Sequence, residues 1–235
     1  MRQLFSQPIN AIFSAARLLF KSRRALVLIV IAYAGLLTAI YLFVSTREAT
    51  IPQLILTTAV VIVAPALFFV LQAASVSYTS GPPSRALISN CLKLIVVSVP
   101  VIAITVLGVH GLSKVDSYVT ITTALRYLLI SVIAPLVAIQ LWIAASSDGL
   151  RALKRNLRRI AVRAFASQSV FVYACGFLIF AVAPYLLITQ TITTETAWLE
   201  FSLLMMRLSV SGLLILLGWV TTVGAISILS RGNEN

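Results

Sequence analysis

The stretch ALVLIVIAYAGLLTAIYLFV, residues 25–44, decides the class of fold because it is apolar nearly throughout and carries no charge. A helix rises about 1.5 Å per residue, so about 20 apolar residues are enough to cross the roughly 30 Å of hydrocarbon in a membrane. The run is too long for the apolar region of a signal peptide, and no clear cleavage site of small residues follows it. We therefore predict that residues 25–44 form an uncleaved first membrane span.

Runs of similar length and composition recur five times along the chain. They are continuous and rich in Leu, Ile, Val and Ala, whereas the strands of a membrane barrel alternate over about 10 residues. Backbone polar groups in lipid must bond to one another, which a helix achieves within one segment. The sequence thus predicts an all-α, polytopic membrane protein, in which residues 1–235 form a single integral-membrane domain with six transmembrane helices. The five further spans are predicted at residues 51–77, 94–112, 119–145, 167–188 and 199–229.

The overall composition agrees with this class of protein. Hydrophobic residues make up 60% of the chain and charged residues 10%, against about 45–50% and about 25% in a typical soluble domain. The net charge is +12. In a soluble protein this excess would indicate nucleic-acid binding, whereas in a membrane protein basic residues hold loops in the cytoplasm and bind anionic headgroups. We expect membrane lipids with anionic headgroups as partners on the cytoplasmic face, and no nucleic acid.

The distribution of basic residues predicts the orientation. The segments before the first span, between the second and third, between the fourth and fifth, and after the sixth hold fourteen Lys and Arg residues together. The alternate segments hold only Arg47 and Lys114. Positive charge stays inside, so both termini are predicted to be cytoplasmic, in the cytoplasmic or inner membrane of a cell.

Two segments outside the spans are predicted to form amphipathic interfacial helices. In the lead, residues 1–24, an apolar face opposes a polar one; the apolar face consists of Phe5, Ile9, Ile12, Phe13, Ala16, Leu19 and Phe20. In the basic loop, residues 146–166, a narrower apolar stripe consists of Leu150, Leu153, Leu157 and Ile160. The basic residues of both segments are candidates for contact with the lipid surface: Arg17, Lys21, Arg23, Arg24, Arg151, Lys154, Arg155, Arg158 and Arg159.

The ends of the second, fourth and sixth spans resemble one another. They contain Ala73-Ala74-Ser75, Ala144-Ala145-Ser146 and Ala225-Ile226-Ser227 respectively. One interpretation is an internal repeat of three helical hairpins, of the kind found in other membrane folds. The other is that small residues are common in such helices wherever they occur. The sequence leaves both interpretations open.

Arg126 and Arg207 are the two charged residues well inside predicted spans, each about two turns from the outer end. A charge in lipid is costly, which marks such residues as functional candidates. They are candidates for contact with an anion or a headgroup. The alternatives are that each side chain extends to the interface or makes a structural bond between helices, with Glu195 and Glu200 as nearby partners for a guanidinium group.

Residue types that carry chemistry are scarce. No Asp or Glu lies in the interior of a span, His110 is the only histidine, and Cys91 and Cys175 have no spacing typical of a disulfide or metal site. No hydrolase, zinc-protease or phosphate-loop motif occurs. We predict that the chain is not an enzyme and has no catalytic residue, no cofactor and no metal site.

Two functions remain from the sequence alone. The first is a non-catalytic scaffold or accessory membrane subunit, which contacts a protein partner or further copies of itself. The second is a small permease or channel for an anionic or amphiphilic solute, which is favoured by the two arginines and by four prolines inside spans. Those prolines, which bend helices and shape cavities, are Pro65, Pro100, Pro135 and Pro184.

Overall fold

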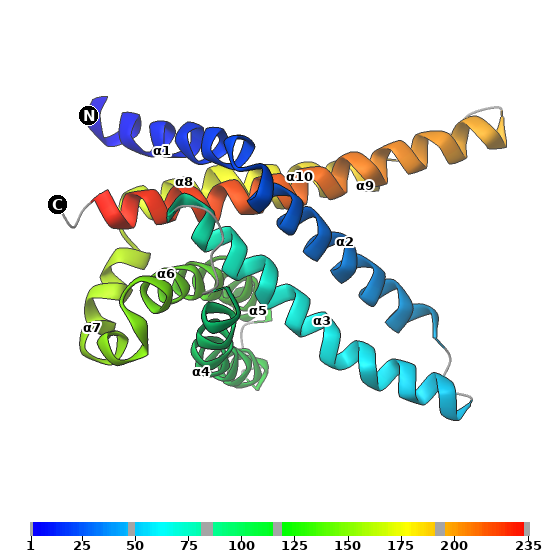
Figure 1. Ribbon diagram of the computed structural model, residues 1–235, viewed down its shortest axis with the longest axis horizontal. Helices are drawn as coiled ribbons and strands as arrows, with labels where there is room; N and C mark the ends of the chain where they lie inside the picture. Colours follow the sequence, from blue (N-terminus) through cyan, green and yellow to red (C-terminus); the bar gives the residue numbers. More distant parts are fainter. Residues whose placement is uncertain (1, 47–49, 81–86, 115–118, 191–195, 233–235) are drawn as a thin grey trace. The chain divides into compact units, whose positions relative to one another are not determined.

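The computed structural model describes residues 2–46, 50–80, 87–114, 119–190 and 196–232. The side chains of residues 2–5, 151–152 and 154–155 are outside this description. All elements in the described ranges are helical (Figure 1). In chain order they are α1 (Arg2–Lys21), α2 (Arg23–Ser45), α3 (Ile51–Ser77), η1 (Tyr78–Ser80), α4 (Leu87–Ser113), α5 (Val119–Leu128), η3 (Leu129–Ile133), α6 (Ala134–Ser147), α7 (Gly149–Ala164), α8 (Ser167–Phe177), η4 (Leu178–Val182), α9 (Ala183–Thr189) and α10 (Ala197–Gly232).

Six helical stretches within the described residues are long and apolar enough to cross a membrane. They are α2, α3 with η1, α4, the continuous run from α5 to α6, the run from α8 to α9, and α10. The prediction of an all-α, polytopic protein with six spans is therefore confirmed. The third span is longer than predicted, because α4 begins at Leu87 and includes Lys93 without a break.

Short connections fix two of the changes in direction along the chain. A single residue, Ser22, separates α1 from α2, and its backbone leaves the helical region at φ −91° and ψ 78°. A single residue, Asp148, also separates α6 from α7, and Gly149 follows it with φ +77°. A residue with a side chain is strained in that left-handed conformation, and glycine is not.

The chain forms two compact units, of which the larger is Leu18–Phe165. Within it, α2 packs beside α3, and α4 packs against α6, α3 and α5. Trp142 on α6 donates from Nε1 to Ser98 Oγ on α4 over 2.8 Å, between two buried side chains. The ring of Phe68 on α3 meets Trp142 edge to face, with centroids 6.3 Å apart. Buried Trp N–H groups need such a partner, so this bond fixes how α4 and α6 pair.

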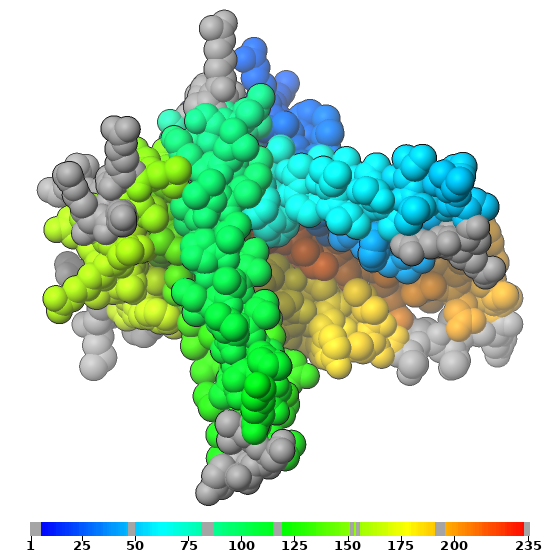
Figure 2. Space-filling view, turned by 90° about the horizontal axis from the view of Figure 1, so that it is seen from below, coloured from blue at the N-terminus to red at the C-terminus, as the bar shows by residue number. Residues whose placement is uncertain are grey.

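Burial in this unit is uneven along the spans. On α3, apart from Thr57 and Val60, the buried side chains form one run from Leu71 to Val76 in its C-terminal part, and on α6 they lie between Leu136 and Ala145. The alanine and serine motif of the second span is therefore core. Figure 2 shows α4 uncovered along much of its length on the face in view, and Val99, Ile104 and Leu107 are more than half exposed there.

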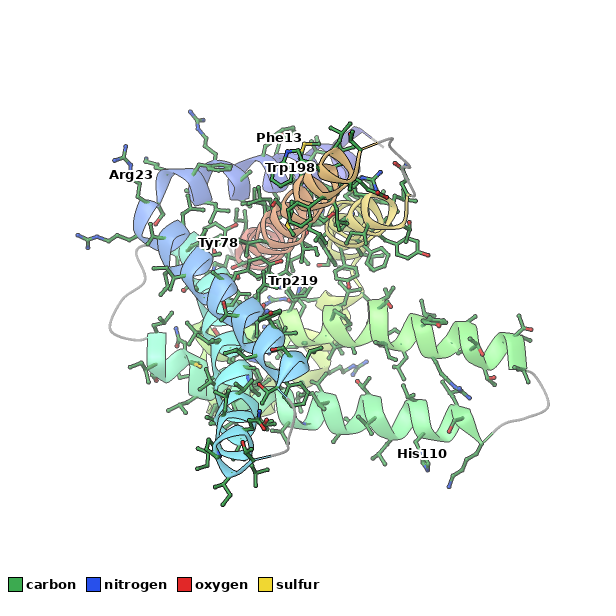
Figure 3. All side chains as sticks on the ribbon, turned by 90° about the vertical axis from the view of Figure 1, so that its right-hand side faces the viewer. Phe13, Arg23, Tyr78, His110, Trp198 and Trp219 are labelled. Atoms are coloured by element: carbon green, nitrogen blue, oxygen red, sulfur yellow. The ribbon has the colours of Figure 1, made fainter. Side chains whose placement is uncertain are left out.

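The smaller unit consists of Met1–Arg17 and Ala166–Asn235. Within it, α8, η4 and α9 pack along α10 (Figure 1). Their interface combines aromatic rings with small residues. Phe180 meets Trp219 edge to face, with centroids 5.3 Å apart, and also contacts Tyr173 and Phe177. Trp219 is labelled in Figure 3 among these rings.

Two glycines allow α8 and η4 to lie close to α10. A Cβ atom on Gly176 would overlap the side chain of Thr222, and one on Gly218 would lie 2.9 Å from Phe180 Cβ. Thr222 Oγ1 donates back to the Gly218 carbonyl over 2.6 Å, so its hydroxyl has a partner inside the helix. Small residues at crossing points are a common way to bring membrane helices together.

Two of the four span prolines follow a wider helical turn. Pro135 comes directly after η3 and Ala134, and Pro184 directly after η4 and Ala183. In both cases the alanine N–H donates to a carbonyl five residues back, as in a π-helix. A proline ring crowds the carbonyl four residues before it, and the wider turn relieves that crowding. Pro65 and Pro100 lie in α-helix without such a turn.

The first testable prediction concerns the crossing of α8 and α10. Gly176→Ala should lower the melting temperature in detergent, because the new methyl group meets Thr222; overpacking of this kind costs about 1–3 kcal/mol. Gly111→Ala is the matched control, since a Cβ atom there has nothing within 4 Å. It should leave the melting temperature equal or higher, because alanine favours helix over glycine. Equal melting temperatures for the two variants would contradict the close crossing.

Candidate functional site

Arg126 on α5 closes the turn of the second hairpin. Its Nη2 atom donates to the carbonyl of Leu112, in the last turn of α4, over 2.9 Å. The last four carbonyls of a helix have no partner within the helix, and a positive charge is stabilised near that end by the helix dipole. The bond therefore ties the start of the fourth span to the end of the third.

Arg207 on α10 does the same in the third hairpin. Its Nη1 atom donates to the carbonyl of Gln190, the residue that ends α9, over 2.5 Å. Arg207 follows Arg126 by 81 positions, and Ala225 follows Ala144 by the same 81. The two arginines thus hold equivalent places relative to the ends of their spans and make equivalent bonds.

The first hairpin has no such bond among its described residues. The chain has an apolar residue in the corresponding region of α3, Leu56, whose side chain is 40% exposed. The second and third hairpins therefore share a bond from an arginine to a terminal carbonyl that has no counterpart in the described residues of the first. The threefold repeat stays a prediction, with its strongest support in the last two hairpins.

Each arginine retains a second enclosed donor. Arg126 Nε and Arg207 Nη2 are both shielded from solvent, and neither has a hydrogen-bond partner among the residues that the structure describes. Glu195, a predicted partner, lies outside the described residues. Glu200 is exposed on α10, two turns before Arg207. Each guanidinium group thus has one N–H bonded to a backbone carbonyl and another N–H that is enclosed without an acceptor among the described residues.

The predicted lipid-contact residues form exposed basic surfaces where the structure describes them. Arg17 and Lys21 on α1, and Arg23 and Arg24 at the start of α2, are all exposed, and Figure 3 labels Arg23. On α7 the side chains of Arg158 and Arg159 are exposed. The side chains of Arg151, Lys154 and Arg155 lie outside the described residues.

Helix α1 has three sectors rather than two. Pro8, Ala11, Ala15 and Leu19 form a buried stripe of mostly small residues. Beside it lies an exposed apolar sector that includes Ile9, Phe13 (70% exposed) and Phe20; Phe13 is labelled in Figure 3. The third sector is polar and basic. Gln168 Nε2 on α8 donates to Gln7 Oε1 over 2.7 Å, which joins the first part of α1 to its own unit.

Of the buried stripe of α1, Leu19 was singled out from the sequence, whereas Pro8, Ala11 and Ala15 were not. Sequence reasoning grouped mainly the bulky apolar residues into one face, of which Leu19 is the one that is buried among the side chains that the structure describes. A signal was present, because Pro8, Ala11, Ala15 and Leu19 recur at spacings of three and four residues, which places them on one side of a helix.

The apolar stripe of α7 is shared between the protein and its surroundings. Ile160 is buried in a cluster with Val97 of α4 and with Leu141 and Ala145 of α6, and Leu153 packs against the same cluster. Leu150 and Leu157, on the adjoining side, are 40% and 51% exposed. Ile160 and Leu153 of the predicted stripe therefore hold α7 against α4 and α6, whereas Leu150 and Leu157 are exposed.

Exposed aromatic residues lie near the ends of several spans. Tyr41 near the end of α2, Tyr127 on α5, Tyr185 on α9 and Trp198 at the start of α10 are each about two-thirds exposed or more. Tyr and Trp are enriched where a membrane meets water. These residues were not predicted as site residues, although their positions near span ends are visible in the sequence.

The remaining candidates do not come together into a reactive site. His110 lies near the end of α4 (Figure 3), and its carbonyl accepts a bond from Ser113 Oγ. Within the described ranges, no three His, Cys, Asp or Glu residues are grouped so that they could hold a metal ion. Gln72 and Gln140 are buried and both have interaction partners.

Comparisons with protein-family models, with curated proteins and with solved structures gave no match. Inferences about function therefore rest on the geometry of the chain itself.

The second prediction separates the two halves of the α7 stripe. Ile160→Ala should loosen α7 from α4 and α6, because it removes buried apolar volume at a cost of about 2–5 kcal/mol. Trypsin should then cleave at Arg158 and Arg159 faster than in the unaltered protein. Leu157→Ala changes an exposed residue and should leave the cleavage rate unchanged in detergent. Equal cleavage of both variants would show that α7 is not held by Ile160.

Proposed function

We propose that this chain is a non-catalytic membrane scaffold or accessory subunit. In this proposal α1 and α7 lie in the interface of one leaflet and hold anionic lipids, while the spans contact a protein partner or another copy of the chain. The observation that carries the proposal is the division of α1 into a buried stripe, an exposed apolar sector and a basic sector. A helix built in this way is suited to dock on its own protein and lie on lipid at the same time.

The placement of the basic helices supports a single lipid-facing side. With six spans, the lead before the first span, α7 between the fourth and fifth, and the tail all fall on one side of the membrane. Because that side holds most of the basic residues, the positive-inside rule favours the cytoplasm for it. Each basic residue near an anionic surface contributes about 1 kcal/mol of attraction, so several together stabilise a peripheral helix substantially.

The exposed spans support a partner. In the most apolar 18-residue stretch of α2, 17% of the residues are buried, and the same holds for α3 and for α4. In the corresponding stretch of α10, 50% are buried. Apolar side chains on these helices need lipid or another protein around them. An accessory subunit of the proposed kind presents such helices to a partner. Its spans need few charged residues, because it catalyses no reaction.

A permease for an anionic or amphiphilic solute is the second candidate. The two π-helical segments that precede Pro135 and Pro184 favour it, because such segments are frequent at functional sites in helices. Uptake of a labelled organic anion by proteoliposomes, above that of empty liposomes and reduced by Pro135→Ala and Pro184→Ala, would favour transport and contradict the scaffold proposal.

The third prediction tests whether α1 lies in the interface. Cys91 and Cys175 are first replaced by alanine, and single cysteines are then introduced as Phe13→Cys or Ser14→Cys, at adjacent exposed positions in the apolar and polar sectors. In vesicles with anionic lipid, a water-soluble maleimide should label Ser14→Cys at least about tenfold faster, because lipid covers the other sector.

The same two variants in denaturant provide the control, since both thiols should then react at similar rates. Similar labelling of the two positions in vesicles, with α1 still helical, would contradict an interfacial location for α1. Such a result would leave only the span contacts to support the scaffold proposal.

The fourth prediction tests for a protein partner of the spans. A photo-reactive amino acid in place of Ile104, which is 69% exposed on α4, should form a cross-link to another polypeptide in native membranes. The same substitution for Leu94, which is fully buried on α4, is the matched control and should not reach another chain. Lipid adducts alone at Ile104, and likewise at exposed positions of α2 and α3, would contradict the scaffold proposal.

A further inference from the structure

The enclosed donors of Arg126 and Arg207 require an acceptor. A guanidinium group has five N–H donors in a planar fork and carries its charge at any physiological pH. Leaving a buried donor of a charged group unpaired costs about 1–3 kcal/mol or more. Since Arg126 Nε and Arg207 Nη2 are both enclosed with no partner in the described ranges of the chain, each position favours an anionic oxygen as its acceptor.

The bonds to the backbone hold the guanidinium groups in place for such a ligand. Arg126 is fixed by the Leu112 carbonyl and Arg207 by the Gln190 carbonyl. A long side chain that is already ordered loses less conformational entropy when it binds, which strengthens the interaction. The arginines also differ here from Arg23, Arg24, Arg158 and Arg159, whose side chains are exposed.

Exposed tyrosines of the kind found at membrane interfaces lie near both arginines in the sequence or along the bonded helix. Tyr127, which is 69% exposed, directly follows Arg126 in the sequence, and Tyr185, 66% exposed, lies on α9 one turn before the residue that Arg207 caps. Exposed tyrosines of this kind lie at the level of the headgroups. The two donors are therefore close to the zone where phosphate groups are abundant.

We propose that Arg126 and Arg207 each bind an oxygen of a phosphate-class anion, in two separate sites, one beside the end of α4 and one beside the end of α9. The ligand is the phosphodiester of a membrane lipid headgroup or free phosphate, and the spare donors are Nε of Arg126 and Nη2 of Arg207. Charge-assisted bonds from arginine to phosphate are short and strong. Each site lies within one unit, Arg126 in the larger and Arg207 in the smaller. The inference does not depend on the scaffold proposal, because α1 and α7 take no part in it.

Lysine variants separate ligand binding from closure of the hairpin. A lysine at either position keeps the positive charge and can still donate to the carbonyl, but it lacks the planar fork. Phosphatidylglycerol retained per chain after detergent washing is counted by native mass spectrometry. Arg126→Lys and Arg207→Lys should each retain one lipid fewer than the unaltered protein, and the double variant two fewer. Lys93→Arg, which exchanges the same two residue types on α4 outside the predicted lipid-contact residues, is the control and should retain the unaltered number.

A second arm distinguishes lipid from free phosphate. Inorganic phosphate, phosphatidylglycerol with short chains, and a diacylglycerol without phosphate are titrated against the melting temperature. A rise with phosphatidylglycerol alone that is smaller in the double lysine variant assigns the sites to lipid. A rise with inorganic phosphate that is likewise smaller in that variant assigns them to free phosphate. An equal rise with the diacylglycerol would mean that acyl chains explain the effect, and would overturn the proposal.

Two other results would also overturn it. The first is an unchanged number of retained lipids in all lysine variants, together with an unchanged response to inorganic phosphate. The second is a lower melting temperature for Asp116→Asn or Glu195→Gln, which change acidic residues in the segments that follow α4 and α9, together with no rise in the melting temperature of the unaltered protein with any phosphate compound. A carboxylate of the chain would then satisfy the arginines. Neither result bears on the labelling of α1, so the two proposals fail separately.

Discussion

The backbone's need to satisfy its own hydrogen bonds in lipid governs the rest of this structure. It requires each apolar run to be helical from one side of the membrane to the other, and it leaves the helix ends as the places where polar groups remain open. The two arginines inside the spans form their hydrogen bonds at these ends. Arg126 and Arg207 donate to terminal carbonyls of the preceding helix. Each arginine thus supplies a hydrogen-bond donor to a carbonyl that has no partner within its own helix.

Within the spans, specificity comes from shape more than from polarity. The hydrophobic effect does not drive helices together in lipid, so close packing and a few hydrogen bonds must do so. The larger unit uses the bond from Trp142 to Ser98, and the smaller one uses Gly176 and Gly218 beside Thr222 and Phe180. Burial is concentrated in the C-terminal parts of α3 and α10 and along most of α6, and these regions contain the small residues of the three similar motifs.

The number and approximate limits of the spans could be predicted from the sequence, because hydrocarbon thickness sets a length that composition reveals directly. The start of α4 at Leu87 could not, since Lys93 near a helix end costs little when its long side chain reaches the interface. The partner of Arg126 was likewise beyond the sequence, because Leu112 accepts through its backbone and any residue type offers a carbonyl. The burial of Ile160 but not Leu157 depends on where α7 meets α4 and α6, and periodicity alone does not distinguish two neighbours on one stripe.

The joint at Ser22 limits how the chain can be altered around it. Ser22 is the one non-helical residue between α1 and α2, so a change that made its backbone helical would merge the last turn of α1 and the first turn of α2 into one continuous helix. The direction in which the first span leaves the lead segment therefore depends on the backbone conformation of a single residue.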